Sequence, residues 1–191
     1  MRHRVALSLA LLGLPLAAQD ITGGLQTGLS LPVGDLKDKS NYGTNQFFGA
    51  HIGGHLDFKL TNNHEIRAQL TYHSLPGSGW GGARDYKNDF KILQAGADWV
   101  YHFQGPSQGW YTIAGASLNS VKNDWSAVGS SGSYSQSGKL GLRGGGGYTF
   151  NQMFSLEGTL NQVFVDKNGG DGFGFDTATW AQVSAVFRFG R

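Results

Sequence analysis

Residues 47–60 read Phe-Phe-Gly-Ala-His-Ile-Gly-Gly-His-Leu-Asp-Phe-Lys-Leu, and apolar and polar side chains alternate along them. Phe48, Ile52 and Leu56 share one phase of this alternation, whereas His51 and Asp57 share the other. Because successive side chains of a β-strand point to opposite faces, this period of two predicts a strand with one apolar and one polar face.

The same alternation recurs in eight segments of the chain. The connections between them alternate in length, with loops of 14, 14, 15 and 11 residues and turns of 4, 6 and 3 residues. Short turns join antiparallel neighbours, and the long loops then gather at the opposite rim. The sequence therefore predicts an all-β, eight-stranded antiparallel up-and-down transmembrane β-barrel. The expected strands are Ile21–Pro32, Phe47–Leu60, Glu65–Ser74, Asp89–Phe103, Trp110–Val121, Ser137–Phe150, Phe154–Val165 and Thr177–Phe189.

In two of these segments the sequence does not decide which alternating set of side chains faces lipid. Phe90 and Ile92 fall out of phase with the apolar residues after them, which indicates either a bulge near Leu93 or an inward turn above the membrane. In the fifth segment, Trp110, Ala114, Ala116 and Leu118 compete with Tyr111, Ile113 and Val121 for the lipid side.

Composition limits the class of protein. The 191 residues suffice for one domain, and charged residues make up 15%, well below the roughly 25% typical of soluble domains. The absence of cysteine excludes disulfides and thiolate metal sites. The formal charge of +2 comes from Arg2 and Arg4, so the remaining chain is neutral and no electrostatic case for nucleic-acid binding exists.

The first 18 residues are typical of a cleaved secretory signal. Arg2 and Arg4 precede an apolar run, Val5 to Leu16, and small residues follow before Gln19. The run is 12 residues long, whereas a spanning helix needs about 20. We therefore expect a signal peptide over residues 1–18 and a barrel domain over residues 19–191.

Alternation alone does not say which face of the barrel looks outward. A soluble eight-stranded barrel encloses a ligand with its apolar face, whereas a membrane barrel turns that face to lipid. The polar face here carries few charges for a solvated surface, the connections are asymmetric in length, and aromatic residues cluster beside the short turns. All three features favour lipid. The clustered aromatic residues are Phe58, Tyr101, Phe103, Tyr148, Phe150, Phe154, Phe187 and Phe189.

The segment Trp180–Phe189 alternates and finishes on an aromatic residue. With this ending, the chain from Ile21 to Phe189 resembles the small outer-membrane barrels of the OmpA-domain and OmpX type, although it continues to Gly190 and Arg191. The resemblance implies export to the cell outer membrane and a C-terminal assembly signal, Phe187 and Phe189, read by the barrel-assembly machinery. It also implies contact with outer-membrane lipids, including lipopolysaccharide, as a monomer.

The polar face carries the candidates for a lumen site. We expect them to form a structural salt-bridge network, with pairs drawn from Asp57, Glu65, Arg67 and Lys59 and a further pair between Arg143 and Glu157, because buried charges need partners. Four residues of strand separate His51 from His55 by about 13 Å, too far for a two-ligand metal clamp. No metal or cofactor is expected. The candidates are His51, His55, Asp57, Lys59, Glu65, Arg67, Asp98, Lys139, Arg143 and Glu157, joined by His73 and Arg188.

Three functions remain open at this point. The first is a structural, membrane-integrity or adhesive role through the external loops; the second is a narrow porin-like channel for small or hydrophobic solutes; the third is a lipid A-modifying enzyme. Tyr72-His73-Ser74 invites the enzyme hypothesis, but adjacent strand residues face opposite ways, so His73 and Ser74 are not expected to pair and we expect no enzyme. Loop aromatics available for surface contacts are Trp80, Tyr86, Trp125, Tyr134, Phe173 and Phe175.

Overall fold

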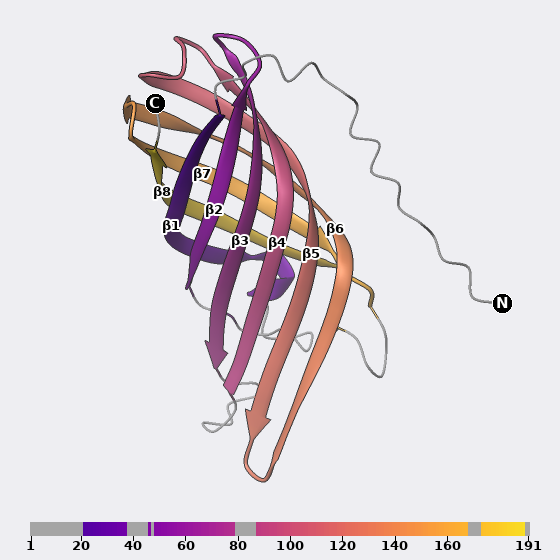
Figure 1. Cartoon of the computed structure of the whole chain (residues 1–191). Coiled ribbons are helices and arrows are strands. Elements are labelled where there is room, and N and C mark those ends of the chain that lie inside the picture. The colour runs from indigo at the N-terminus through magenta and orange to yellow at the C-terminus, as the bar shows by residue number, and fades with distance from the viewer. Residues whose placement is uncertain (1–20, 38–45, 47, 79–86, 168–172, 190–191) are drawn as a thin grey trace, which may run out of the picture.

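The protein is a closed barrel of eight strands in which each strand pairs antiparallel with its sequence neighbours and β1 pairs with β8 (Figure 1). The computed structural model describes residues 21–37, 46, 48–78, 87–167 and 173–189. This architecture confirms the predicted fold class. The elements are β1 (Ile21–Val33), η1 (Gly34–Leu36), β2 (Gly49–Lys59), β3 (His64–Ser78), β4 (Lys87–His102), β5 (Gly109–Ala127), β6 (Ser130–Asn151), β7 (Phe154–Phe164) and β8 (Thr177–Phe189).

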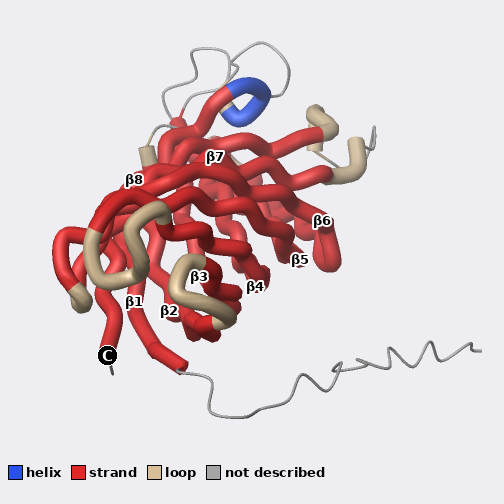
Figure 2. Tube along the Cα trace, turned by 90° about the horizontal axis from the view of Figure 1, so that it is seen from above, coloured by secondary structure: helices blue, strands red, loops and turns tan. Residues whose placement is uncertain are grey.

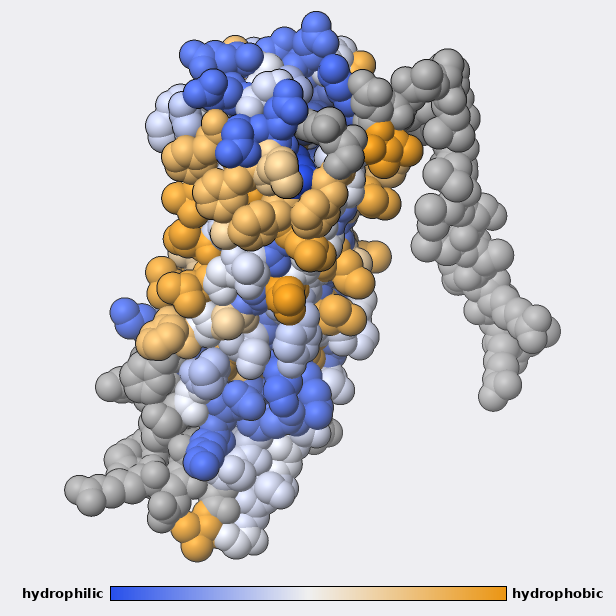
Figure 3. Space-filling model, turned by 60° about the vertical axis from the view of Figure 1, so that its left-hand side comes forward, coloured by the Kyte–Doolittle hydropathy of each residue, from blue (hydrophilic) through white to orange (hydrophobic). Residues whose placement is uncertain are grey.

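The apolar face of the wall looks outward. Leu25, Ile52 and Leu142 are each more than half exposed, whereas polar residues between them are buried inside the barrel. The exposed apolar residues form a band between two hydrophilic zones (Figure 3), and the strands wrap an enclosed interior (Figure 2). This arrangement is that of a membrane barrel and not of a barrel that holds a ligand on its apolar face. Within the described ranges, no helix is long and apolar enough to cross a membrane.

Aromatic rings encircle part of the rim that carries the short turns. Tyr148 lies between Trp110 and Phe150 at centroid distances of 5.1 Å each, and Phe154 lies between Phe150 and Phe187 at 5.6 and 5.3 Å. Amphipathic and aromatic rings at one depth are typical of a membrane interface. Tyr148, Phe150, Phe154 and Phe187, four of the rings that sequence analysis placed beside the short turns, therefore do gather there.

The opposite rim differs from the sequence prediction. Residues 122–136 were expected to be a loop, but β5 continues to Ala127 and β6 begins at Ser130, so they form a hairpin that extends away from the barrel (Figure 1). Gly129 turns the chain there with φ 79°. Serine and glycine have low strand propensity, but continued pairing with β4 and β5 supplies ladder hydrogen bonds that outweigh it. Likewise β3 continues to Ser78, into the stretch expected to be a loop.

The two ambiguous segments are resolved by the register. Phe90 and Ile92 pair in unbroken register with β3 and β5 and are buried inside, so the bulge alternative was wrong and the inward alternative was right. In β5, Trp110 and Leu118 face outward, while the competing set that includes Tyr111 lies inside. A register shift does occur between β5 and β6, at Asn119/Val121, beside Gly138 with φ 70°.

Candidate functional site: the barrel interior

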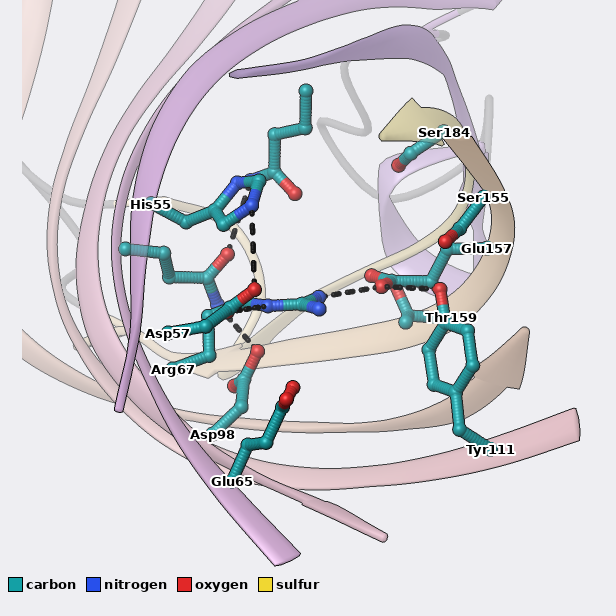
Figure 4. A network of polar contacts seen from close by, with 12 residues as sticks. His55, Asp57, Glu65, Arg67, Asp98, Tyr111, Ser155, Glu157, Thr159 and Ser184 are labelled. Atoms are coloured by element: carbon teal, nitrogen blue, oxygen red, sulfur yellow. Dashed lines mark hydrogen bonds and ion pairs between the residues drawn. The ribbon is translucent and has the colours of Figure 1, made fainter. Parts of the chain in front are cut away.

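A chain of alternating charges crosses the barrel interior. Arg67 lies at its centre, with Nε 2.8 Å from Asp57 Oδ1 and Nη1 2.7 Å from Glu157 Oε2 (Figure 4). Asp57 also accepts a hydrogen bond from Arg188 Nε at 3.0 Å. At the other end, Glu157 pairs with Arg143, whose Nη1 lies 3.5 Å from Asp98 Oδ2.

The order of charges along this chain is positive and negative in strict turn: Arg188, Asp57, Arg67, Glu157, Arg143, Asp98. Three guanidinium groups balance three carboxylates, which is the condition under which buried ions are tolerated. The six residues come from six different strands, β8, β2, β3, β7, β6 and β4. Three of the five links, β8 to β2, β3 to β7 and β6 to β4, join strands that are not neighbours in the sheet.

Neutral side chains extend this charge chain. Gln69 donates from Nε2 to Asp98 Oδ2 at 3.0 Å, and its Oε1 accepts hydrogen bonds from Arg143 and from Gln26 Nε2. Tyr111 donates its hydroxyl to Glu157 at 3.3 Å. A Cβ added to Gly147 would lie 2.5 Å from that hydroxyl, so glycine at this position leaves the room that the Tyr111 ring occupies.

A histidine and serine layer lies on the loop side of the charges. Ser30 Oγ lies 3.2 Å from His51 Nδ1 and 3.1 Å from His73 Nδ1, while His51 Nε2 contacts Ser184 Oγ at 3.0 Å. Ser74, the sequence neighbour of His73, is not its partner. Within the described ranges, no group of three or more histidine, aspartate or glutamate side chains could hold a metal ion.

A buried apolar cluster, called the plug below, lies inside the loop-side end of the barrel. The rings of Phe173 and Phe175 stack with their centroids 5.4 Å apart, and the Phe90 ring packs edge-on against Phe173 with a centroid distance of 5.5 Å. The Trp180 and His73 rings pack edge to face with their centroids 5.1 Å apart. This contact joins the plug to the histidine layer. The buried plug consists of Leu36, Leu75, Phe90, Ile92, Val121, Val163, Val165, Phe173, Phe175, Ala178 and Trp180.

Several sequence predictions are corrected by these contacts. Phe173 and Phe175 were expected on the exposed loops but are 3% and 4% exposed, because their rings pack against Phe90 in the buried apolar cluster. Lys59 and Lys139 were expected in the lumen network. Lys59 is half-buried, and Glu65, its expected partner, lies 3.0 Å from His102 Nε2. Lys139 pairs with Asp166 at the loop-side rim.

The other predicted lumen residues lie inside, where the period of two placed them. His55 approaches Asp57 at 3.7 Å, and Asp98, Arg143 and Glu157 join the chain of charges. Sequence analysis did not single out the neutral partners of these charges. Their residue types and inward phase could be seen in the sequence, but nothing local distinguished them from other polar residues. These partners are Gln26, Ser30, Gln69, Tyr111, Gln182 and Ser184.

A second charge cluster lies outside, just beyond the apolar band. Lys91 Nζ is 2.9 Å from Asp124 Oδ2, and Lys122 Nζ is 2.8 Å from Asp124 Oδ1. The hydrogen bonds from Lys122 and Lys91 lower the pKa of the Asp124 carboxyl, and the bond with Asp124 raises the pKa of Lys91. Of the predicted loop aromatics, Trp125 and Tyr134 lie on β5 and β6 of this protruding hairpin and are half-buried, while Trp80 and Tyr86 lie outside the described residues.

The barrel is similar to solved structures of small outer-membrane barrels. Ail, the attachment invasion locus protein of Yersinia pestis, superposes with a TM-score of 0.58 at 14% identity, covering 90% of this chain and 100% of Ail. The N-terminal β-barrel domain of Pseudomonas aeruginosa OprF superposes with a TM-score of 0.53 at 16% identity, covering 90% and 98%. No protein-family model and no curated protein sequence matches the chain. The chain thus has the fold of the small eight-stranded outer-membrane barrels, as the C-terminal pattern suggested.

Proposed function

We propose that this chain is an exported outer-membrane protein that supports envelope integrity and makes contacts outside the cell through its loop-side rim. The observation that carries the proposal is the combination of an apolar outer band with a filled polar interior. In this proposal residues 1–18 are the cleaved signal, and Phe187 and Phe189 serve in assembly. The protein is a monomer in this proposal, and outer-membrane lipids surround its apolar band.

The filled interior supports a structural role over a channel. Within the described residues, charged pairs cross the lumen and the apolar plug covers one mouth, and an eight-stranded barrel has room for little besides its own side chains. Planar-bilayer recordings test this point. We expect no conductance steps from the folded protein, and reproducible unitary steps would favour the channel alternative.

The contacts also favour a structural role over catalysis on lipid. The Ser30 contacts with His51 and His73 form a serine–histidine arrangement, but these side chains are buried inside the wall beneath the plug, away from the face that lipid reaches. A nucleophile that acts on lipid A needs access to it. Mass spectrometry of lipid A with and without expression is expected to give the same acyl pattern, and a changed pattern would support the enzyme hypothesis.

The localisation has its own test. Because barrels held by closed ladders resist detergent, the folded protein is expected in the outer-membrane fraction and to migrate differently on gels before and after boiling. Cells that lack the protein are expected to be more sensitive to detergent and to bind fewer surface ligands. Recovery of the protein in the soluble fraction without detergent would contradict the proposal.

A further inference from the structure

Two buried histidine rings share one serine hydroxyl on the loop side of the charge chain. His51 on β2 and His73 on β3 lie opposite each other in register, and their ring centroids are 5.4 Å apart. Ser30 Oγ on β1 lies 3.2 Å from His51 Nδ1 and 3.1 Å from His73 Nδ1. Gly28 leaves room for this arrangement, since a Cβ added there would lie 3.0 Å from His51 Cε1.

The hydrogen bonds around His51 fix the position of its proton. The Gln182 amide oxygen accepts a hydrogen bond from Asn161 Nδ2 at 3.3 Å, so the Gln182 amide nitrogen points away from Asn161 and donates to His51 Nε2 at 3.2 Å. Because an amide nitrogen cannot accept, His51 Nε2 is the acceptor and carries no proton. Ser184 Oγ lies 3.0 Å from the same ring nitrogen. The neutral His51 ring therefore carries its proton on Nδ1 and donates it to Ser30.

The same direction continues through Ser30 to His73. Because Ser30 Oγ accepts from His51 Nδ1, its own hydroxyl proton is donated to His73 Nδ1. His73 Nδ1 is then an acceptor, and the neutral His73 ring carries its proton on Nε2. The hydrogen bonds from Gln182 through His51 and Ser30 to His73 thus run in one direction, and they are satisfied when both rings are neutral.

The surroundings of these rings disfavour a positive charge on either of them. The charged side chains that act on the rings are Arg143 from β6 and Glu157 from β7. Glu157 is already paired with Arg67 and Arg143, so two imidazolium ions here would repel each other and Arg143. The other groups that face the rings are neutral: Ser30 on β1, Gln94 on β4, Asn161 on β7, and Trp180, Gln182 and Ser184 on β8.

Trp180 connects the two histidines to the plug. Its ring is fully buried, belongs to the apolar cluster and lies against His73 with a centroid distance of 5.1 Å. A charge on His73 would therefore lie against an apolar cluster, where an ion without a partner is strongly disfavoured. Protonation of the rings and close packing of the plug thus oppose each other.

We propose that Ser30, His51 and His73 form an acid-released latch that holds the plug in place while both rings are neutral. Below about pH 6, where a solvated histidine takes up a proton, the two rings gain charge, turn away from their neutral partners and free Trp180 with the plug around it. The latch lies toward the loop-side end of the barrel, which faces the outside of the cell in the proposed function, so it responds to external acid. The inference rests on the proposed function for this orientation alone.

Proton linkage sets the size and the sign of the expected effect. The released state binds more protons than the latched state, so release is favoured as the pH falls. A solvated ring titrates near its ordinary pKa of about 6.5, so a change from pH 7 to pH 5 favours one released ring over a neutral latched ring by up to about 25-fold. Two rings together allow up to about 600-fold, which is an upper limit because other contacts also hold the plug.

The first test reads the two tautomers by NMR. In protein labelled with ¹⁵N at histidine, in detergent micelles at pH 7, the nitrogen chemical shift distinguishes a protonated from an unprotonated ring nitrogen. We expect His51 to carry its proton on Nδ1 and His73 on Nε2, and the single variants His51→Gln and His73→Gln assign the signals by their loss. The Nε2–H form in both rings, or a doubly protonated ring at pH 7, would overturn the latch.

The second test follows release of the plug with a single thiol, which the absence of cysteine from the chain makes possible. Val163→Cys places the thiol in the buried plug, and Val128→Cys, at the exposed tip of the β5–β6 hairpin, corrects for the pH dependence of the reagent itself. The probe is dithiodipyridine, which reacts with thiols in acid as well as at neutral pH. We expect the labelling rate of V163C relative to V128C to rise at least about tenfold from pH 7 to pH 5. A flat ratio would overturn the latch.

Replacing both histidines assigns this pH step to the latch. Glutamine keeps an amide that donates and accepts but takes up no proton, so V163C combined with H51Q and H73Q should change its relative rate by about twofold at most. His64→Gln, which changes a histidine beside Trp99 at the short-turn rim, is the matched control and should keep the full step. A step that persists without His51 and His73 would overturn the latch.

Gel migration before and after boiling shows at both pH values whether each variant is a folded barrel. Loss of the folded band of the parent protein at pH 5 would mean that the whole barrel unfolds, and it would overturn local release. If the glutamine variants do not fold, the tautomers of the parent protein still decide the question. None of these outcomes changes the proposed function, which is tested by cell fractionation and by lipid A analysis.

Discussion

Removing Arg67 is the most direct test of the charge chain. Its guanidinium is fully buried and makes two ion pairs, at 2.8 Å to Asp57 and 2.7 Å to Glu157. Arg67→Met keeps the length of the side chain but removes both pairs. Asp57 then retains Arg188 and Glu157 retains Arg143, so neither carboxylate is left wholly alone.

The expected loss follows from these two contacts. A hydrogen bond to a charged group contributes about 1.5–3 kcal/mol, and breaking a buried ion pair by removing one partner costs about 3–5 kcal/mol. Because each carboxylate keeps one arginine, we expect a loss of about 3–5 kcal/mol in the free energy of unfolding and not the sum of two isolated pairs. Lys91→Met removes an ion pair at the exposed rim and should cost at most about 1 kcal/mol.

Urea titration of the barrel in phospholipid vesicles measures both variants. The fraction folded is followed by gel migration without boiling, and the midpoint and slope give the free energy. Arg67→Met combined with Glu157→Gln, which removes the one negative charge left in excess and keeps the Arg188–Asp57 and Arg143–Asp98 pairs, should recover part of the loss. If Arg67→Met cost no more than Lys91→Met, the buried charges would not hold the barrel together.

Three further predictions address other parts of the molecule. Leu142→Arg, on the lipid face, should cost about 2–4 kcal/mol in the same urea titration, whereas Thr159→Ser in the lumen should cost far less; equal effects would reverse the two faces. Phe173→Ser should weaken the plug and produce conductance steps absent from the parent protein in planar bilayers, and a silent variant would show that other residues close the barrel. The Asp124 carboxyl, at the loop-side rim, should titrate below its usual range by NMR, so its ion pairs are present at neutral pH and are lost as pH falls through that lowered pKa; Lys122→Met should move the pKa back up, and an unchanged titration would contradict the pairing.

The fold was readable from local patterns because strand geometry is itself local. The alternation in residues 47–60 reports the two faces of a strand directly, and β2 occupies most of that stretch. The alternating lengths of the connections gave the topology, since short turns force antiparallel neighbours. Hairpin pairs such as Asp57 with Arg67 followed from the same register, because these two residues lie opposite each other in neighbouring strands.

Contacts across the lumen could not be predicted from local sequence patterns. Arg67 and Glu157 are separated by 90 residues and lie on β3 and β7, which are not paired in the sheet. Only closure of the barrel brings these strands within reach of a long side chain. The burial of Phe173 and Phe175 has the same cause, since no periodic signal marks the residues outside the strands that pack inside the closed barrel.

The sequence by itself determined the strands, their order and the face that meets lipid, because each depends on a period or a length that neighbouring residues express. The tertiary structure alone decided which charges are partners and which residues outside the strands pack into the buried apolar cluster. Those features depend on distances between segments far apart in the chain, which exist only after the sheet has curved and closed on itself.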